Sequence, residues 1–103
     1  MPLTKLQIQT IGECLRAAAY GPFFPSGEFD AISGLSRSQV ALVADEWPIV
    51  VQNADISHTA VSNTLNNLIG YPIKKELMLA WEEFISADRE DLRKLFQDWK
   101  TNK

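Results

Sequence analysis

Capping residues and helix breakers divide this chain into short segments, and each segment carries an apolar stripe at helical spacing. Thr4 opens a capping-box pattern, and the helix predicted after it ends at Gly21, before Pro22. Ser36 opens a second capping box, and Pro48 ends that helix. Such amphipathic helices bury their stripes against one another. The β-branched run after Pro48 has no second strand pattern to pair with, so we expect an all-α fold.

Three further helices are expected in the rest of the chain. One begins near Asp55 or Ser57 and ends at Gly70, the next follows directly, and Ser86 caps the last. The expected architecture is a compact bundle of about five short helices, with frayed residues at the end of the chain. After the first helix, chain breakers and two adjacent phenylalanines predict a rigid loop, Gly21–Gly27, that folds back onto the core.

Residues 1–103 are expected to form a single domain, because a chain of this length can bury one core without disulfide or metal staples. Trp47, Trp81 and Trp99 each end an apolar stripe and are expected to anchor that core. One Cys permits no internal disulfide, and one Cys with one His cannot form a zinc-finger ligand set. No apolar run approaches the ~20 residues that span a bilayer, and no export-signal pattern occurs. We therefore expect a cytoplasmic protein without cofactor, metal or membrane contact.

His58 is the one side chain that ordinarily titrates near neutral pH, so acid–base catalysis would depend on it. Its neighbours Ser57 and Thr59 point in other directions on a helix and do not converge on a nucleophile. Cys14 lies among apolar residues of the first helix, where a thiol serves packing. We assign no catalytic residue and expect that the chain is not an enzyme and takes no small-molecule substrate.

Three asparagines, Asn63, Asn66 and Asn67, share one face of the third predicted helix, although asparagine is a weak helix former. Their amides could brace the Phe23–Phe24 loop through hydrogen bonds to its backbone. Alternatively, they could form a polar contact face for a partner. The sequence leaves both explanations open.

The segment Ile56–Asn67 resembles the recognition helix of lactose-repressor-type regulators, which have a similar Val-Ser-x-x-Thr-Val-Ser-x-x-Leu-Asn-Asn string. This resemblance implies a helix-turn-helix-like DNA-binding regulator that uses residues 56–68. However, eight residues separate the segment from Trp47, whereas a helix-turn-helix has about three or four in its turn. No Lys or Arg occurs between Arg37 and Lys74 to neutralise phosphates. The resemblance and these two departures from it together make DNA binding the alternative to protein binding, and not the first choice.

Acidic residues concentrate in the middle of the chain. Residues 28–83 hold eight acidic and three basic side chains, whereas the two ends are each slightly basic, and the net charge of the chain is -3. A negative face of this kind can speed and orient the encounter with a basic protein, although charged helix faces also serve solubility. The residues that we expect to bind a partner are Glu28, Asp30, Asp45, Glu46, Asp55, Glu82 and Glu83.

Three segments together resemble a group of short, uncharacterised bacterial proteins that are all-helical by their patterns. These segments are Gly21–Phe29, with its Gly-Pro-Phe-Phe-Pro loop, Trp47–Pro48, and Asn66–Pro72, with its Asn-Asn-x-x-Gly-Tyr-Pro pattern. In size, acidity and lack of catalytic groups, the chain also resembles the immunity proteins of contact-dependent or secreted bacterial nuclease toxins. This resemblance implies a non-enzymatic protein that covers the active site of a basic toxin domain, with carboxylates in place of substrate phosphates.

Overall fold

The computed structural model is a compact assembly of helices, 36 × 26 × 20 Å along its principal axes. It describes residues 4–24, 29, 31, 34–47, 54–70 and 75–101. The helices are α1 (Lys5–Tyr20), α3 (Arg37–Glu46), α4 (Ala54–Gly70), α5 (Lys75–Met78), α6 (Trp81–Phe84) and α7 (Arg89–Thr101). The described residues contain no strand, and the predicted all-α fold is confirmed.

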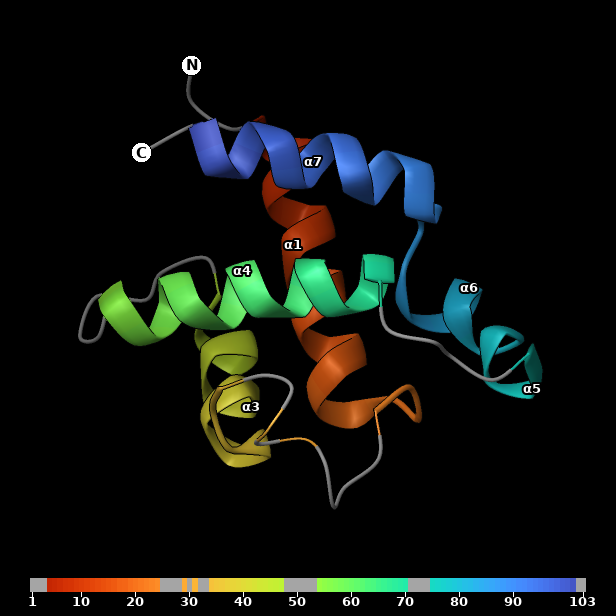
Figure 1. Ribbon diagram of the computed structural model, residues 1–103, viewed down its shortest axis with the longest axis horizontal. Coiled ribbons are helices and arrows are strands. Elements are labelled where there is room, and N and C mark those ends of the chain that lie inside the picture. The colour runs from red at the N-terminus through yellow and green to blue at the C-terminus, as the bar shows by residue number, and fades with distance from the viewer. Residues whose placement is uncertain are drawn as a thin grey trace.

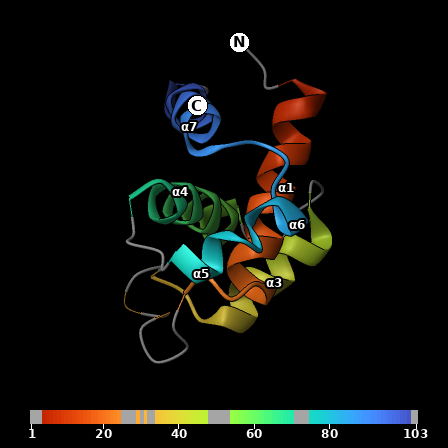
Figure 2. The same ribbon diagram turned by 90° about the vertical axis from the view of Figure 1, so that its right-hand side faces the viewer.

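The arrangement centres on α1, which α3, α4 and α6 all contact. In Figure 1, α4 crosses in front of α1, and α7 lies beside α4 and runs antiparallel to it. The helices α3 and α6 lie on opposite sides of α1. Figure 2 shows α4 and α7 end-on, stacked along the length of α1. Among the helices described, none is long and apolar enough to cross a membrane.

Both predicted capping boxes are present. The Thr4 hydroxyl accepts a hydrogen bond from the Gln7 backbone N–H at 3.1 Å, and the Gln7 side chain accepts the Thr4 N–H at 2.9 Å. Ser36 and Gln39 repeat this geometry at 3.2 and 2.9 Å. These contacts involve residues three apart and need no tertiary structure, which is why the sequence predicted them.

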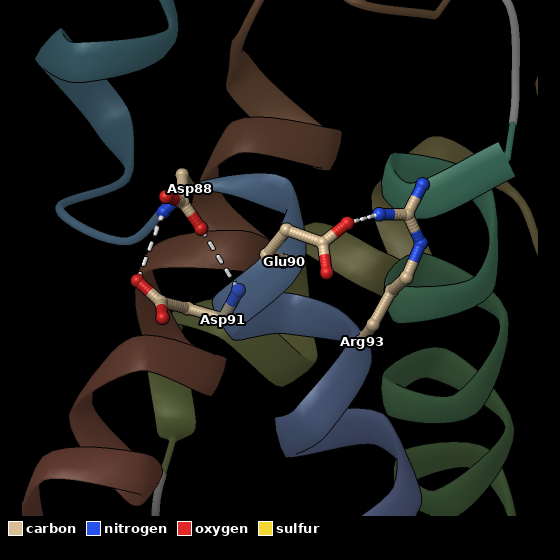
Figure 3. Close-up of polar contacts among 4 residues, drawn as sticks. All are labelled: Asp88, Glu90, Asp91 and Arg93. Carbon is tan, nitrogen blue, oxygen red and sulfur yellow. Dashed lines mark hydrogen bonds and ion pairs between the residues drawn. The ribbon is translucent and has the colours of Figure 1, made fainter.

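The predicted Ser86 cap is wrong. The first turn of α7 is capped by Asp88, whose Oδ1 accepts the Asp91 backbone N–H at 2.8 Å (Figure 3). Asp91 in turn accepts the Asp88 N–H at 3.4 Å. Ser86 lies two residues earlier and donates both its backbone N–H and its hydroxyl to Glu13 of α1. The helix therefore begins later because Ser86 takes a tertiary partner.

The segment expected to form one helix after residue 72 contains two single turns, α5 and α6, within the part that the structure describes. Ala80, which lies between them, donates its N–H to Leu77 O of α5 and accepts the N–H of Glu83 of α6, both at 3.1 Å. Such bonds tighten the backbone relative to an α-helix. The break directs Trp81 inward, where its ring meets Phe23 edge-to-face at 5.8 Å.

The core lies on the side of α1 that carries Ile11, Cys14 and Leu15, all fully buried. The other fully buried large side chains come from every main helix and from the loop after α1. They are Phe23, Phe29, Val40, Val61, Leu65, Leu68, Ile85 and Leu92. Their burial joins the predicted stripes into one core.

The three tryptophans differ in depth. Trp81 is buried, as expected of a core anchor, whereas Trp47 and Trp99 are half-buried against the core. Each indole N–H has an acceptor: Ala87 O for Trp81, Ile8 O for Trp47 and the Ser62 hydroxyl for Trp99, at 2.7–2.9 Å. Gly12 makes room for Trp47, because a Cβ there would lie 2.9 Å from its Cδ1 atom.

Arg37 binds the end of α1 to the loop that follows it. Its guanidinium donates to the carbonyl oxygens of Ala18 and Ala19 at 3.1 Å each and of Phe24 at 2.9 Å. It also lies over the Phe29 ring at 4.3 Å. The last carbonyls of a helix lack partners within the helix, and a cation suits its negative end. Residues 25–27 of the predicted rigid loop lie outside the described residues, whereas Phe23 and Phe24 are buried.

Candidate functional site

The acidic residues expected to bind a partner fall into two described groups on either side of α1. Asp45 and Glu46 are exposed in the last turn of α3, and Glu82 and Glu83 are exposed on α6. Because α3 and α6 contact α1 from opposite sides (Figure 1), these two groups do not form a single cluster. Glu28 and Asp30 lie outside the described residues, as does the side chain of Asp55 near the start of α4.

An exposed strip of α1 lies between the two groups. Lys5, Gln9, Arg16 and Tyr20 recur at helical spacing on the face opposite the buried residues, with Leu6 at its border. We call these five residues the α1 strip. The strip is mostly polar, but Leu6 and Tyr20 leave 68% and 56% of their surfaces in solvent. These two side chains lie near opposite ends of α1, so they are separate apolar points on a polar strip rather than one patch.

Tyr20 joins the α1 strip to α3. Its hydroxyl donates to the Asp45 carboxylate, with distances of 2.9 and 3.1 Å to the two oxygens. This hydrogen bond raises the pKa of Tyr20, with burial and the Asp45 charge acting in the same direction and Arg16 opposing them. The contact spans 25 residues of sequence, so periodicity alone could not reveal it.

Several other carboxylates have partners inside the protein. Glu13 accepts from Ser86, Asp98 accepts from the Gln7 amide, Asp88 and Asp91 cap α7, and Glu90 pairs with Arg93 (Figure 3). By contrast, no side-chain hydrogen bond or ion pair joins Glu46, Glu82 or Glu83 to any described residue. All three side chains are exposed.

His58 and Cys14 show no catalytic arrangement in the described part of the chain. The exposed His58 ring lies against Trp99, with ring centroids 5.3 Å apart and planes inclined by 32°. Cys14 is fully buried, and burial raises the pKa of its thiol. Within the same residues, no three His, Cys, Asp or Glu side chains gather as metal ligands would.

The three asparagines of α4 have different surroundings. Asn66 is exposed, whereas Asn63 and Asn67 are half-buried. The Asn63 amide nitrogen lies 3.2 Å from the position of a Cβ on Gly34, a residue with a φ of 74° just before α3. Asn63 therefore packs against the turn before α3, and only Asn66 of the three is fully presented to solvent.

Sequence reasoning missed two features of this region. The Tyr20–Asp45 hydrogen bond and the role of Arg37 both depend on how α1 and α3 pack.

Comparison of the chain with protein-family models, with curated proteins and with solved structures finds no match. The resemblances noted in the sequence thus stay predictions, and the function must be argued from the residues themselves.

Proposed function

We propose that the chain is a non-enzymatic, cytoplasmic binding protein that neutralises a basic bacterial toxin domain, such as a nuclease, by covering its active site. The observation that supports this proposal is that three exposed carboxylates, Glu46, Glu82 and Glu83, have no side-chain hydrogen bond or ion pair to any residue that the structure describes. A carboxylate that has no partner in the free protein gives up no internal hydrogen bond when it meets a Lys or Arg. Such carboxylates can replace the phosphates that a nuclease site binds.

Asp45 differs from these three carboxylates because its side chain is held in one orientation. Tyr20 holds the carboxylate at the border of the α1 strip through both of its oxygens, and both residues are exposed. A charge that is already positioned loses less conformational freedom on binding than a freely rotating one. Asp45 can therefore present its charge to a cation of the partner in a defined orientation.

A role in DNA binding receives less support from the surroundings of α4. No Lys or Arg lies between Arg37 and Lys74, so this helix has no cation of its own to contact phosphates. Two of its three asparagines are half-buried, which reduces what they could offer to base edges. DNA binding is therefore kept as a distinct outcome of the experiment below.

The test begins with capture of binding partners from an extract of the organism that encodes the chain, at low salt. The wild-type chain is compared with a Glu82→Gln/Glu83→Gln variant, and a Glu90→Gln variant serves as control because Glu90 already pairs with Arg93. The captured partner is then purified, and its association rate and nuclease activity are measured with each variant. Because the changes are on the surface, all three proteins should fold equally well.

We expect a basic protein whose nuclease activity disappears in the stoichiometric complex. Its association rate should fall several-fold with the α6 variant, stay within about twofold with the control, and fall as salt rises above about 100 mM. Salt-insensitive association, or equal rates for the two variants, would contradict the proposal. Specific retention of DNA fragments without a protein partner would favour the regulator instead.

A further inference from the structure

A groove of ≈ 430 Å³ lies where α1 and α7 face each other. Its walls come from one turn of α1, from the start of α7 and from the connection before α7. The lining residues are Leu6, Gln7, Thr10, Ser86, Ala87, Asp91, Lys94 and Leu95. Leu6 belongs to the α1 strip, so the groove opens beside the strip that lies between the two acidic groups.

Three polar side chains of the groove are already hydrogen-bonded within the protein. The Gln7 amide donates to Asp98 at 2.8 Å, the Thr10 hydroxyl donates to Leu6 O at 2.9 Å, and the Ser86 hydroxyl donates to Glu13 at 2.9 Å. A polar ligand would have to compete with these bonds. The lining therefore offers mainly apolar surface, and it suits a group that needs no hydrogen bond.

Leu6 provides much of this apolar surface. It leaves 68% of its area in solvent, although Leu95 across the groove is buried. Covering exposed leucine area is favourable in proportion to the area removed from water. An apolar side chain placed between Leu6 and Ala87 would gain this energy without disturbing the internal hydrogen bonds.

Carboxylates outnumber cations among the residues that line the groove or hydrogen-bond to its lining. Its lining holds one carboxylate, Asp91, and one cation, Lys94. Two further carboxylates, Glu13 and Asp98, are hydrogen-bonded to lining side chains, and Asp88 is bonded to Asp91. Cationic groups on either side of an apolar side chain would therefore be attracted, and anionic groups repelled.

We propose that this groove receives an apolar side chain of the protein partner, within a segment that carries Lys or Arg on both sides of it. This inference rests on the proposed function, since it names the anchor by which the basic partner is held. A protein interface usually has an apolar centre and a polar rim. The carboxylates of α3 and α6 speed association, and the groove slows dissociation.

A second groove of ≈ 420 Å³, between α4 and α7, provides an internal contrast. It is lined by Ile69, Phe96 and Gln97 together with Arg93, Lys94, Lys100 and the single carboxylate Glu90. Its excess of positive charge should repel the segment that the first groove attracts. The position of the residues that respond to a bound peptide therefore shows which of the two grooves it occupies.

The probes are three synthetic peptides of equal length, titrated into the ¹⁵N-labelled full chain. The first has a central Leu flanked by Lys, the second has the same Leu flanked by Glu, and the third has Ser between Lys flanks. We expect only the first peptide to shift the amide signals of Thr10, Ala87 and Leu95. A Leu6→Gln variant should weaken its binding about tenfold or more, whereas Leu42→Gln should leave it unchanged. Leu42 is a matched control because it is an exposed leucine, at 59%, on α3.

Four results would overturn the inference. These are no binding of the first peptide, equal binding of the Glu-flanked peptide, signal changes confined to the groove beside Phe96, and wild-type affinity in the Leu6→Gln variant. Because Leu6 is exposed, this substitution should leave the fold intact, and the unchanged NMR spectrum of the free variant checks this. If any of these results is found together with salt-dependent partner capture, the inference about the groove is wrong and the proposed function is still supported. If the first peptide binds but no partner is captured, the groove is retained as a binding site and the proposed function is contradicted.

Discussion

Replacing Arg37 with Ala should destabilise the protein more than any other change of a partly exposed charged residue described above. The guanidinium makes three hydrogen bonds to backbone carbonyls of Ala18, Ala19 and Phe24, all of which are buried residues. A buried carbonyl that loses its partner costs about 1–3 kcal/mol. Because Arg37 is only half-buried, water can partly replace it, and we take the lower value for each bond. The expected loss is about 3 kcal/mol, or roughly 15 °C in Tm for a domain of this size.

Urea unfolding, followed by tryptophan fluorescence and far-UV circular dichroism, measures this loss by linear extrapolation. Arg37→Lys keeps the charge, but a compact ammonium does not match three separate acceptors. We expect this variant to lose about 1–2 kcal/mol. Arg16→Ala is the control, since Arg16 is exposed on the α1 strip, and it should change stability by less than about 0.5 kcal/mol.

The ranking of these variants tests the reasoning directly. If Arg37→Ala costs less than about 1 kcal/mol, the three carbonyls are adequately solvated without the guanidinium. If Lys and Ala variants are equally unstable, the charge at the helix end contributes nothing. A large effect of Arg16→Ala would show that net charge, rather than hydrogen bonding, determines the stability differences.

The remaining predictions concern Cys14, Tyr20 and Gly12. Because burial raises the pKa of Cys14, its thiol should react with a disulfide reagent at about pH 8 orders of magnitude more slowly in the native chain than in urea; comparable rates would contradict this. The Asp45 hydrogen bond raises the pKa of Tyr20 above its ordinary value of 10.0. The hydrogen bond therefore stabilises the folded protein fully below pH 10.0, and this stabilisation is lost as the pH rises through the pKa of Tyr20 in the folded protein. Asp45→Ala should lower the midpoint of the tyrosinate absorbance titration, and an unmoved midpoint would refute the contact. Gly12→Ala should cost about 1–3 kcal/mol, because its Cβ would lie 2.9 Å from Trp47, and the cost should shrink in a Trp47→Phe background.

The parts of the fold that depend on near neighbours were predictable. The capping boxes at Thr4 and Ser36 join residues three apart, and the apolar stripes follow from helical periodicity. The Ser86 prediction failed because two capping residues, Ser86 and Asp88, lie close together. Their tertiary surroundings decide between them: Glu13, which is 73 residues away, binds Ser86, and Asp88 is left to cap α7.

The candidate site was less accessible to sequence reasoning. Composition indicated excess acid in the middle of the chain, but it did not distinguish carboxylates with internal partners from those without. Asp98 binds Gln7 across 91 residues, and Asp45 binds Tyr20 across 25. Such pairings depend on how α1 lies relative to α3 and α7, which no local pattern specifies. The same arrangement creates the groove beside Leu6.

The position of α1 has a consequence for how the chain acquires its structure during synthesis. This helix is translated before α7, yet its polar contacts include Ser86 and Asp98, which the ribosome adds more than 70 residues later. The buried face of α4 likewise packs against α7. Native contacts with such large sequence separation form slowly, because a long loop must close first. Nascent chains that stop before α7 should therefore be sensitive to proteases and dependent on chaperones, and stability should appear cooperatively only once α7 has left the exit tunnel.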